Sequence, residues 1–166
     1  GGAAYIEKNA RFTQNGGLAQ DCEAADSGGA FFAHGGSLIL NNMAVKGNKA
    51  GRDGGAVFAD ADGAVKARIS IEGGAVIGGD AAADANFAQA NGGAVALSGE
   101  GNTLKLDGAT LSGNKAGRDG GAVFASGGTV TVTRGSLSKN SAQANGGAVA
   151  LSGEGSALSL DSVTLA

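Results

Sequence analysis

Short runs of alternating apolar and polar residues recur along the chain. Examples are Leu-Lys-Leu-Asp at 104–107, Val-Thr-Val-Thr at 130–133 and Leu-Ser-Leu-Asp at 158–161. Alternation with a period of two, with branched apolar residues on one side, is typical of half-buried β-strands. No segment keeps an apolar stripe with a 3.6-residue period, so the pattern predicts strands and at most short helices.

The tripeptide Gly-Gly-Ala, followed by apolar residues, precedes these strands. It begins at residues 1, 28, 54, 92, 120 and 146. Four of the five intervals are 26 to 28 residues, and the interval from 54 to 92 is longer because it carries an insertion. Two longer stretches recur unchanged, GNKAGRDGGAVFA at 47–59 and 113–125, and AQANGGAVALSGEG at 88–101 and 142–155. Self-similarity with such a period is the signature of a solenoid.

Each repeat contains the Gly-Gly-Ala strand, the alternating strand and a third short piece such as Leu-Ser-Gly-Asn at 111–114. We therefore predict an all-β fold, a right-handed parallel β-helix (a single-stranded β-solenoid) of about six rungs with three short strands per rung. It would fill residues 1–166 as a single domain, and its hand follows from the usual right-handed crossover. Asn48, Asn114 and Asn140 share the position after the third strand, which predicts a ladder of side-chain amides at one corner.

Composition excludes several classes of protein. The chain has 33 glycines, no proline and 42% hydrophobic residues, which fits neither collagen nor a disordered linker. The net charge is −3 and the 12 basic residues are scattered, so we expect no nucleic-acid partner. No apolar run approaches the roughly 18 residues that would indicate membrane insertion. Cys22 is the only cysteine, and it is either a small buried residue or one half of a bridge between chains.

The repeat resembles that of the chlamydial polymorphic outer-membrane proteins, in which Gly-Gly-Ala-(Ile/Val/Leu) is paired with Phe-x-x-Asn. Here GGAV, GGAF and GGAA match the first element. LSGN, VKGN, LSKN and IEKN (6–9) match the second, with an aliphatic residue in place of the phenylalanine. The resemblance covers essentially the whole chain. It implies a β-helix of the kind found in autotransporter adhesins and long surface proteins, at an extracellular or cell-surface location.

Candidate catalytic residues are not apparent, and we predict that the chain is not an enzyme. Asp107 and Asp161 occupy equivalent positions two rungs apart, which is roughly 10 Å, whereas glycosidic cleavage needs carboxylates about 5–9.5 Å apart. Asp53 and Asp119 follow Arg52 and Arg118, which predicts surface ion pairs. One histidine and one cysteine cannot build a zinc site, so we expect neither a metal nor a cofactor. The alternative function is a carbohydrate-binding or polysaccharide-processing β-helix of the pectate-lyase type.

An ice-binding face is a further alternative. Thr129, Thr131 and Thr133 form one threonine row, but Lys105 and Ser159 stand where an array of such rows would need threonine. The pattern therefore disfavours this function.

An aromatic residue often occupies the fourth position after the opening glycine. These residues are Tyr5, Phe32, Phe58 and Phe124. Alternation places Val57 and Ala59 inward, so the rings would point outward and form an exposed contact stripe. The opposite assignment of faces would bury the rings in the core.

The rung from 54 to 91 carries extra residues around 60–68 and around 80–87. These hold four acidic residues, Asp60, Asp62, Asp80 and Asp84. They form either two solvated acidic loops or a weak site for a cation or a partner.

Together these features predict a non-enzymatic, extracellular structural or adhesive β-solenoid. The chain begins inside a coil at Gly1, and its end at Leu165-Ala166 aligns with Leu111-Ser112, just before a Gly-Asn corner. We therefore expect a segment of a longer surface protein or filamentous appendage. Its expected partners are other copies or further parts of the same assembly, with a cell-surface receptor or glycan as the other class.

Overall fold

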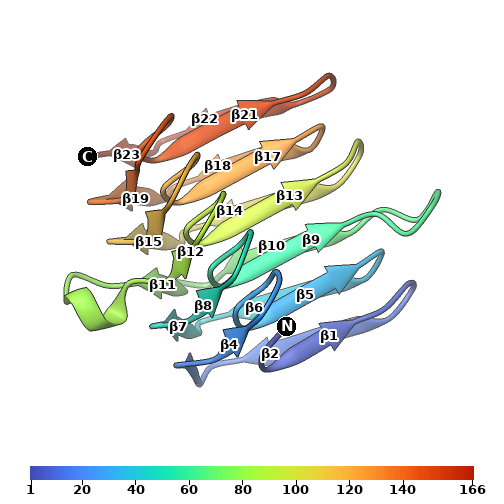
Figure 1. The fold of residues 1–166 in the computed structure, drawn as a ribbon, viewed down its shortest axis with the longest axis horizontal. Coiled ribbons are helices and arrows are strands. Elements are labelled where there is room, and N and C mark those ends of the chain that lie inside the picture. The colour runs from blue at the N-terminus through green and yellow to red at the C-terminus, as the bar shows by residue number, and fades with distance from the viewer.

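Residues 1–166 are described by a computed structural model, in which they form one stack of six rungs (Figure 1). All paired strands of the stack run parallel to their neighbours, and the N- and C-terminal rungs lie at opposite ends. The only helix is a 3-10 turn, η1 (Ala82–Asp84), in the insertion of the third rung. The predicted all-β parallel β-helix of about six rungs is therefore confirmed.

The strands form four sheets along the stack. Sheet A consists of β1 (Ala4–Ile6), β5 (Phe31–His34), β9 (Val57–Asp60), β13 (Val95–Ser98), β17 (Val123–Ser126) and β21 (Val149–Ser152). Sheet B consists of β2 (Arg11–Asn15), β6 (Ser37–Asn41), β10 (Arg68–Glu72), β14 (Thr103–Asp107), β18 (Thr129–Thr133) and β22 (Ala157–Asp161). Sheet C consists of β3 (Leu18–Gln20), β7 (Ala44–Lys46), β11 (Val76–Gly78), β15 (Thr110–Ser112), β19 (Ser136–Ser138) and β23 (Thr164–Leu165).

Sheet D corrects the prediction of three strands per rung, because five of the six rungs have a fourth strand. It consists of β4 (Glu23–Ala24), β8 (Lys49–Ala50), β12 (Phe87–Ala88), β16 (Lys115–Ala116) and β20 (Ser141–Ala142). Each of these strands has two residues, and only the alanine faces the interior. A strand this short shows no alternation, so the sequence pattern read it as part of a corner.

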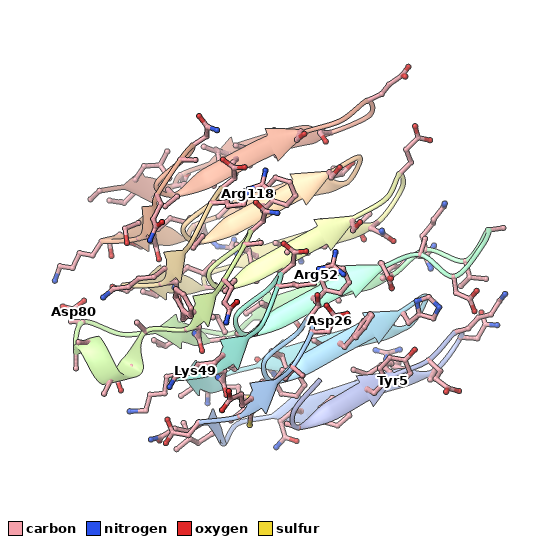
Figure 2. All side chains as sticks on the ribbon, in the orientation of Figure 1. Tyr5, Asp26, Lys49, Arg52, Asp80 and Arg118 are labelled. Carbon is pink, nitrogen blue, oxygen red and sulfur yellow. The ribbon has the colours of Figure 1, made fainter.

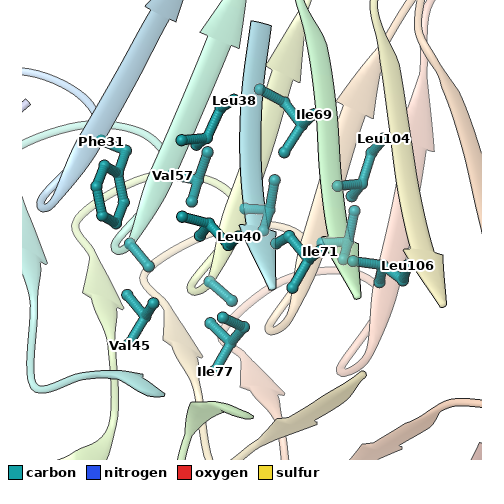
Figure 3. Close-up of a cluster of buried hydrophobic side chains, with 14 of the residues drawn as sticks. Phe31, Leu38, Leu40, Val45, Val57, Ile69, Ile71, Ile77, Leu104 and Leu106 are labelled. Atoms are coloured by element: carbon teal, nitrogen blue, oxygen red, sulfur yellow. The ribbon is translucent and has the colours of Figure 1, made fainter. Parts of the chain in front are cut away.

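The core is a continuous column of inward side chains (Figure 3). In sheet B, Leu38, Ile69 and Leu104 lie in register on successive rungs, and all three are buried. Leu40, Ile71 and Leu106 form a second such row. Full burial of each aliphatic side chain contributes about 1.5–3 kcal/mol, and a single rung could not bury its apolar face alone.

The Gly-Gly-Ala tripeptide is required by the corner between sheets D and A. The first glycine is left-handed, as at Gly54 with φ +67°. The second comes so close to the next rung that a Cβ on Gly55 would lie 2.2 Å from the carbonyl oxygen of Gly93. Ala56 then points into the core and is fully buried. Each of the three positions therefore excludes a larger side chain for its own reason.

Candidate functional site

The outward face of sheet A carries a column of aromatic rings. Tyr5, Phe32 and Phe58 are in register on the first three rungs. Phe32 packs edge-to-face against Tyr5, with ring centroids 5.1 Å apart, and against Phe58, with centroids 5.0 Å apart. Exposure falls along the column, from 52% for Tyr5 to 9% for Phe58. We call Tyr5, Phe32 and Phe58 the aromatic column.

Phe124 does not join the aromatic column. Ala96 lies in register between Phe58 and Phe124, so the two rings are two rungs apart. Phe124 is half-buried on its own rung. Of the four aromatic residues singled out in the sequence, the structure brings three together and leaves one separate.

His34, the last residue of β5, lies beside the aromatic column at the corner between sheets A and B. Its Nδ1 is hydrogen-bonded to Asp60 Oδ1 at 2.6 Å, and its Nε2 lies 3.9 Å from the Asp62 carboxylate. The ring also stacks on Tyr5, with centroids 6.5 Å apart. The hydrogen bond that His34 Nδ1 donates to Asp60, together with the negative charge of Asp60 and Asp62, raises the pKa of His34 against a smaller effect of burial. His34 and Asp60 are in register on neighbouring rungs, and their spacing of one repeat was the sequence signal for this pair.

The four loop aspartates lie in two separate places. Asp60 and Asp62 lie at the corner between sheets A and B, whereas Asp80 and Asp84 lie on the insertion that projects from the opposite side of the stack (Figures 1 and 2). Asp80 accepts hydrogen bonds from Lys139 and Ser112, which lower its pKa, and Asp84 pairs with Lys46 at 3.0 Å. No group of three or more His, Cys, Asp or Glu side chains is arranged to hold a metal ion.

The asparagine ladder runs through the interior of the corner between sheets C and D. Asn48 Nδ2 donates to Asn86 Oδ1, Asn86 Nδ2 to Asn114 Oδ1, and Asn114 Nδ2 to Asn140 Oδ1, at 2.9 to 3.0 Å. Each amide also donates to a backbone carbonyl of the preceding rung, as Asn86 does to Val45. Asn48, Asn86 and Asn114 are fully buried, so these bonds satisfy groups that would be costly to leave unpaired.

Asn86 was missed in the sequence as a member of the ladder, and the wrong residue was assigned to the ladder position of the first rung. The insertion separates Asn86 from the third strand of its rung, yet it stands six residues before Gly92, as Asn114 does before Gly120. In the first rung the equivalent residue is Cys22, whose backbone N–H donates to Asn48 Oδ1 at 3.0 Å. The IEKN match at 6–9 is therefore wrong, because Asn9 is a left-handed residue in the turn after β1.

A second polar column precedes the Gly-Gly-Ala tripeptides. Asn91 Nδ2 donates to Asp53 Oδ1 at 2.9 Å, and Asn145 Nδ2 donates to Asp119 Oδ1 at 2.8 Å. The predicted ion pair between Arg52 and Asp53 is wrong. Arg52 points outward and pairs with Asp26 of the preceding rung at 3.3 Å (Figure 2), because adjacent residues in this turn face different sides.

The carboxylates considered for glycosidic chemistry do not face each other. Asp107, Thr133 and Asp161 are in register on three rungs. Burial acts to raise the pKa of Asp107, but hydrogen bonds and charges from Lys105 and Arg134 outweigh it and leave the pKa below its usual value. A carboxylate held ionised in this way is poorly suited to act as a general acid.

The fold and its ladders define a class, a repeat protein of the parallel β-helix type. Residues 108–126 match the family described as the Chlamydia polymorphic membrane protein repeat. This stretch contains the Leu-Ser-Gly-Asn and Gly-Gly-Ala-Val-Phe-Ala elements of one unit, from the turn before β15 to the end of β17. The chain is thus similar to the β-helix of polymorphic outer-membrane proteins. Neither the curated proteins nor the solved structures provide a match. No helix has the length and apolarity needed to cross a membrane.

Proposed function

We propose that the chain is a non-enzymatic structural segment of a cell-surface or outer-membrane β-helical protein, which associates with a second copy through the aromatic column. The repeat match supports the surface setting, since that family is described as membrane proteins. The aromatic column itself carries the proposal of contact. The exposed ring of Tyr5 packs on Phe32, which in turn packs on Phe58, and an apolar surface of this kind marks protein contacts.

A second copy fits this surface because its rungs have the same spacing. Rings on successive rungs are about 4.8 Å apart along the axis in either copy. Two aromatic columns placed face to face would therefore stay in register at Tyr5 and Phe32, whereas Phe58 is covered by Phe32 and only supports that ring. Aromatic pairs of this kind contribute about 0.5–1.5 kcal/mol beyond the apolar area that they bury.

Sedimentation over a range of concentrations tests the association. The variant Tyr5→Ser/Phe32→Ser should be monomeric at concentrations where the wild type associates, and the matched control Phe124→Ser should associate like the wild type. Circular dichroism and thermal melts establish that each variant is folded. A monomeric wild type, or a folded double variant that associates normally, would falsify the proposal.

The absence of enzymatic activity is proposed because several carboxylates are already paired with neighbouring side chains. Asp60 is bonded to His34, Asp80 to Lys139 and Ser112, and Asp107 to Arg134 and Lys105. Incubation with polygalacturonate should release no reducing ends and no unsaturated product above a boiled control. Release that follows protein concentration would show an enzyme instead.

A further inference from the structure

Three cationic side chains surround a depression at the corner between sheets A and B. Arg11 and Arg68 are exposed, and Lys66 is half-buried. They line a cavity of about 290 Å³, together with Asn9, Ser37 and the Gly35–Gly36 backbone. We call Arg11, Lys66 and Arg68 the basic corner. It lies on the first three rungs, on the side of the stack from which the loop between β9 and β10 projects (Figure 1).

The strand register fixes the spacing of the basic corner. Arg11, Ser37 and Arg68 are the first residues of β2, β6 and β10, and they are paired in that order. The two arginines are thus two rungs apart, about 10 Å along the axis, with the Ser37 hydroxyl between them. Lys66 comes from the insertion of the third rung, and its stem lies beside Gly101. The glycine leaves room for this stem, which positions the lysine at the rim.

The charge of the basic corner is not compensated. None of its three cations forms an ion pair, although the chain as a whole has a net charge of −3. The nearby Asp62 carboxylate is directed toward Lys8, at 3.7 Å, and toward His34. No acidic side chain lines the cavity. A concave surface that is lined by positive charges and lacks negative ones attracts anions.

We propose that the basic corner binds an acidic glycan, a chain carrying repeated sulfate or carboxylate groups. Guanidinium groups form paired hydrogen bonds with such anions, and Ser37 and Asn9 add neutral polar groups between the cations. Cations on the first and third rungs match several anionic groups along a polymer better than one isolated anion. The basic corner is separate from the aromatic column, so this proposal and self-association can fail independently.

Calorimetric titration with a size-defined, heparin-derived oligosaccharide tests the assignment. The folded variant Arg11→Gln/Arg68→Gln should bind about tenfold more weakly or worse, because two charge-assisted contacts are lost. Lys66→Gln should show a smaller loss. The matched control is Arg118→Gln, an exposed arginine of the fourth rung that forms no ion pair, and its affinity should change less than about twofold.

Vesicles containing phosphatidylserine distinguish a glycan from a lipid headgroup. Saturable binding to the oligosaccharide, lost in Arg11→Gln/Arg68→Gln and kept in Arg118→Gln, supports the proposal. Equal weakening by both variants means general charge attraction and overturns it. Binding to vesicles without binding to the oligosaccharide also overturns it, and so does the absence of saturation with either probe. Thermal melts of each variant show that the fold is kept.

Discussion

At the scale of single residues, glycine is required for different reasons at different positions. Gly55 has the carbonyl oxygen of Gly93 where its Cβ would be, whereas Gly63 is left-handed with open space around it. We expect Gly55→Ala to destabilise the fold by about 3 kcal/mol or more, because two rungs must separate. Gly63→Ala is the control and should cost only about 1–2 kcal/mol from backbone strain. Urea denaturation measures both, and similar losses would contradict this assignment.

The asparagine ladder predicts a stabilising substitution at Cys22. An asparagine there could donate from Nδ2 to Asn48 Oδ1, as Asn48 does to Asn86. We expect Cys22→Asn to raise the free energy of unfolding by about 1 kcal/mol, the usual contribution of one hydrogen bond. Cys22→Ala separates this gain from loss of the thiol, and Asn86→Ala should lose about 2–4 kcal/mol by leaving buried groups unpaired. An unchanged or lowered stability of Cys22→Asn would disprove extension of the ladder.

His34 gives the fold a dependence on pH. Its pKa is raised in the folded chain above the ordinary value of about 6.5, chiefly by the hydrogen bond to Asp60. The protonated ring therefore contributes stability that is fully present below about pH 6.5 and lost as the pH rises through the raised pKa. As the pH rises above about 6.5, the free energy of unfolding of the wild type should therefore decline relative to that of His34→Gln. His34 is the only histidine, so its NMR resonance reports the pKa directly. A pKa at or below 6.5 would refute the argument.

A single residue could be placed from the sequence when it stood at a constant distance from a recognisable strand or Gly-Gly-Ala tripeptide of its rung. Asn48 and Asn114 could be aligned because each follows its third strand after a single glycine. Asn86 could not be aligned from that side, because the insertion precedes it, although its distance to Gly92 was unchanged. The exposure of Phe58, in contrast, depended on packing: its side chain points outward, yet Phe32 covers it. Alternation gives direction but not coverage.

At the scale of elements, the longer strands could be predicted from the sequence and the shortest ones could not. The five-residue strands of sheet B alternate clearly, as in Thr103–Asp107, and were identified from the pattern. The two-residue strands of sheet D, such as Lys115–Ala116, carry a single inward alanine and were missed. The basic corner was also missed, because Arg11 and Arg68 are far apart in the chain and meet only through the register of β2, β6 and β10.

The insertion between β11 and β12 should be dispensable. Deleting 80–85 leaves Ile-Gly-Gly-Asn, which matches the Leu-Ser-Gly-Asn of the next rung and keeps Asn86 in the ladder. The lost contacts are largely surface ion pairs, such as Asp84 with Lys46, which are worth about 0–1 kcal/mol each. We expect thermal melts to show a change of about 1–2 kcal/mol. Deleting 104–109, also six residues, removes core residues and should abolish folding. A large loss from the first deletion would show that the insertion supports the stack.

At the scale of the whole molecule, the stack is held by contacts between neighbouring rungs. The interior rungs bury their leucines fully, as at Leu104 and Leu106, whereas Leu158 and Leu160 of the last rung are 36% and 41% exposed. Stability in such an array is a sum of rung terms and nearest-neighbour interface terms. Hydrogen exchange should therefore be slowest for the amides of β10 and β14 and faster toward β2 and β22. Uniform protection would indicate one cooperative unit instead.

Duplicating a rung tests this additivity directly. A second copy of residues 120–145 inserted before Gly146 preserves the Gly-Gly-Ala spacing, the Val130 and Val132 core positions and the Asn140 ladder position. The stack gains one rung and one further rung-to-rung interface, so the free energy of unfolding should rise by a few kcal/mol and the strand signal in circular dichroism should grow in proportion. The control is the same insertion with Val130→Ser/Val132→Ser, which keeps length and glycines but removes the inward side chains. If the duplicated rung lowers stability as much as this control does, rung-to-rung burial is not what holds the stack together.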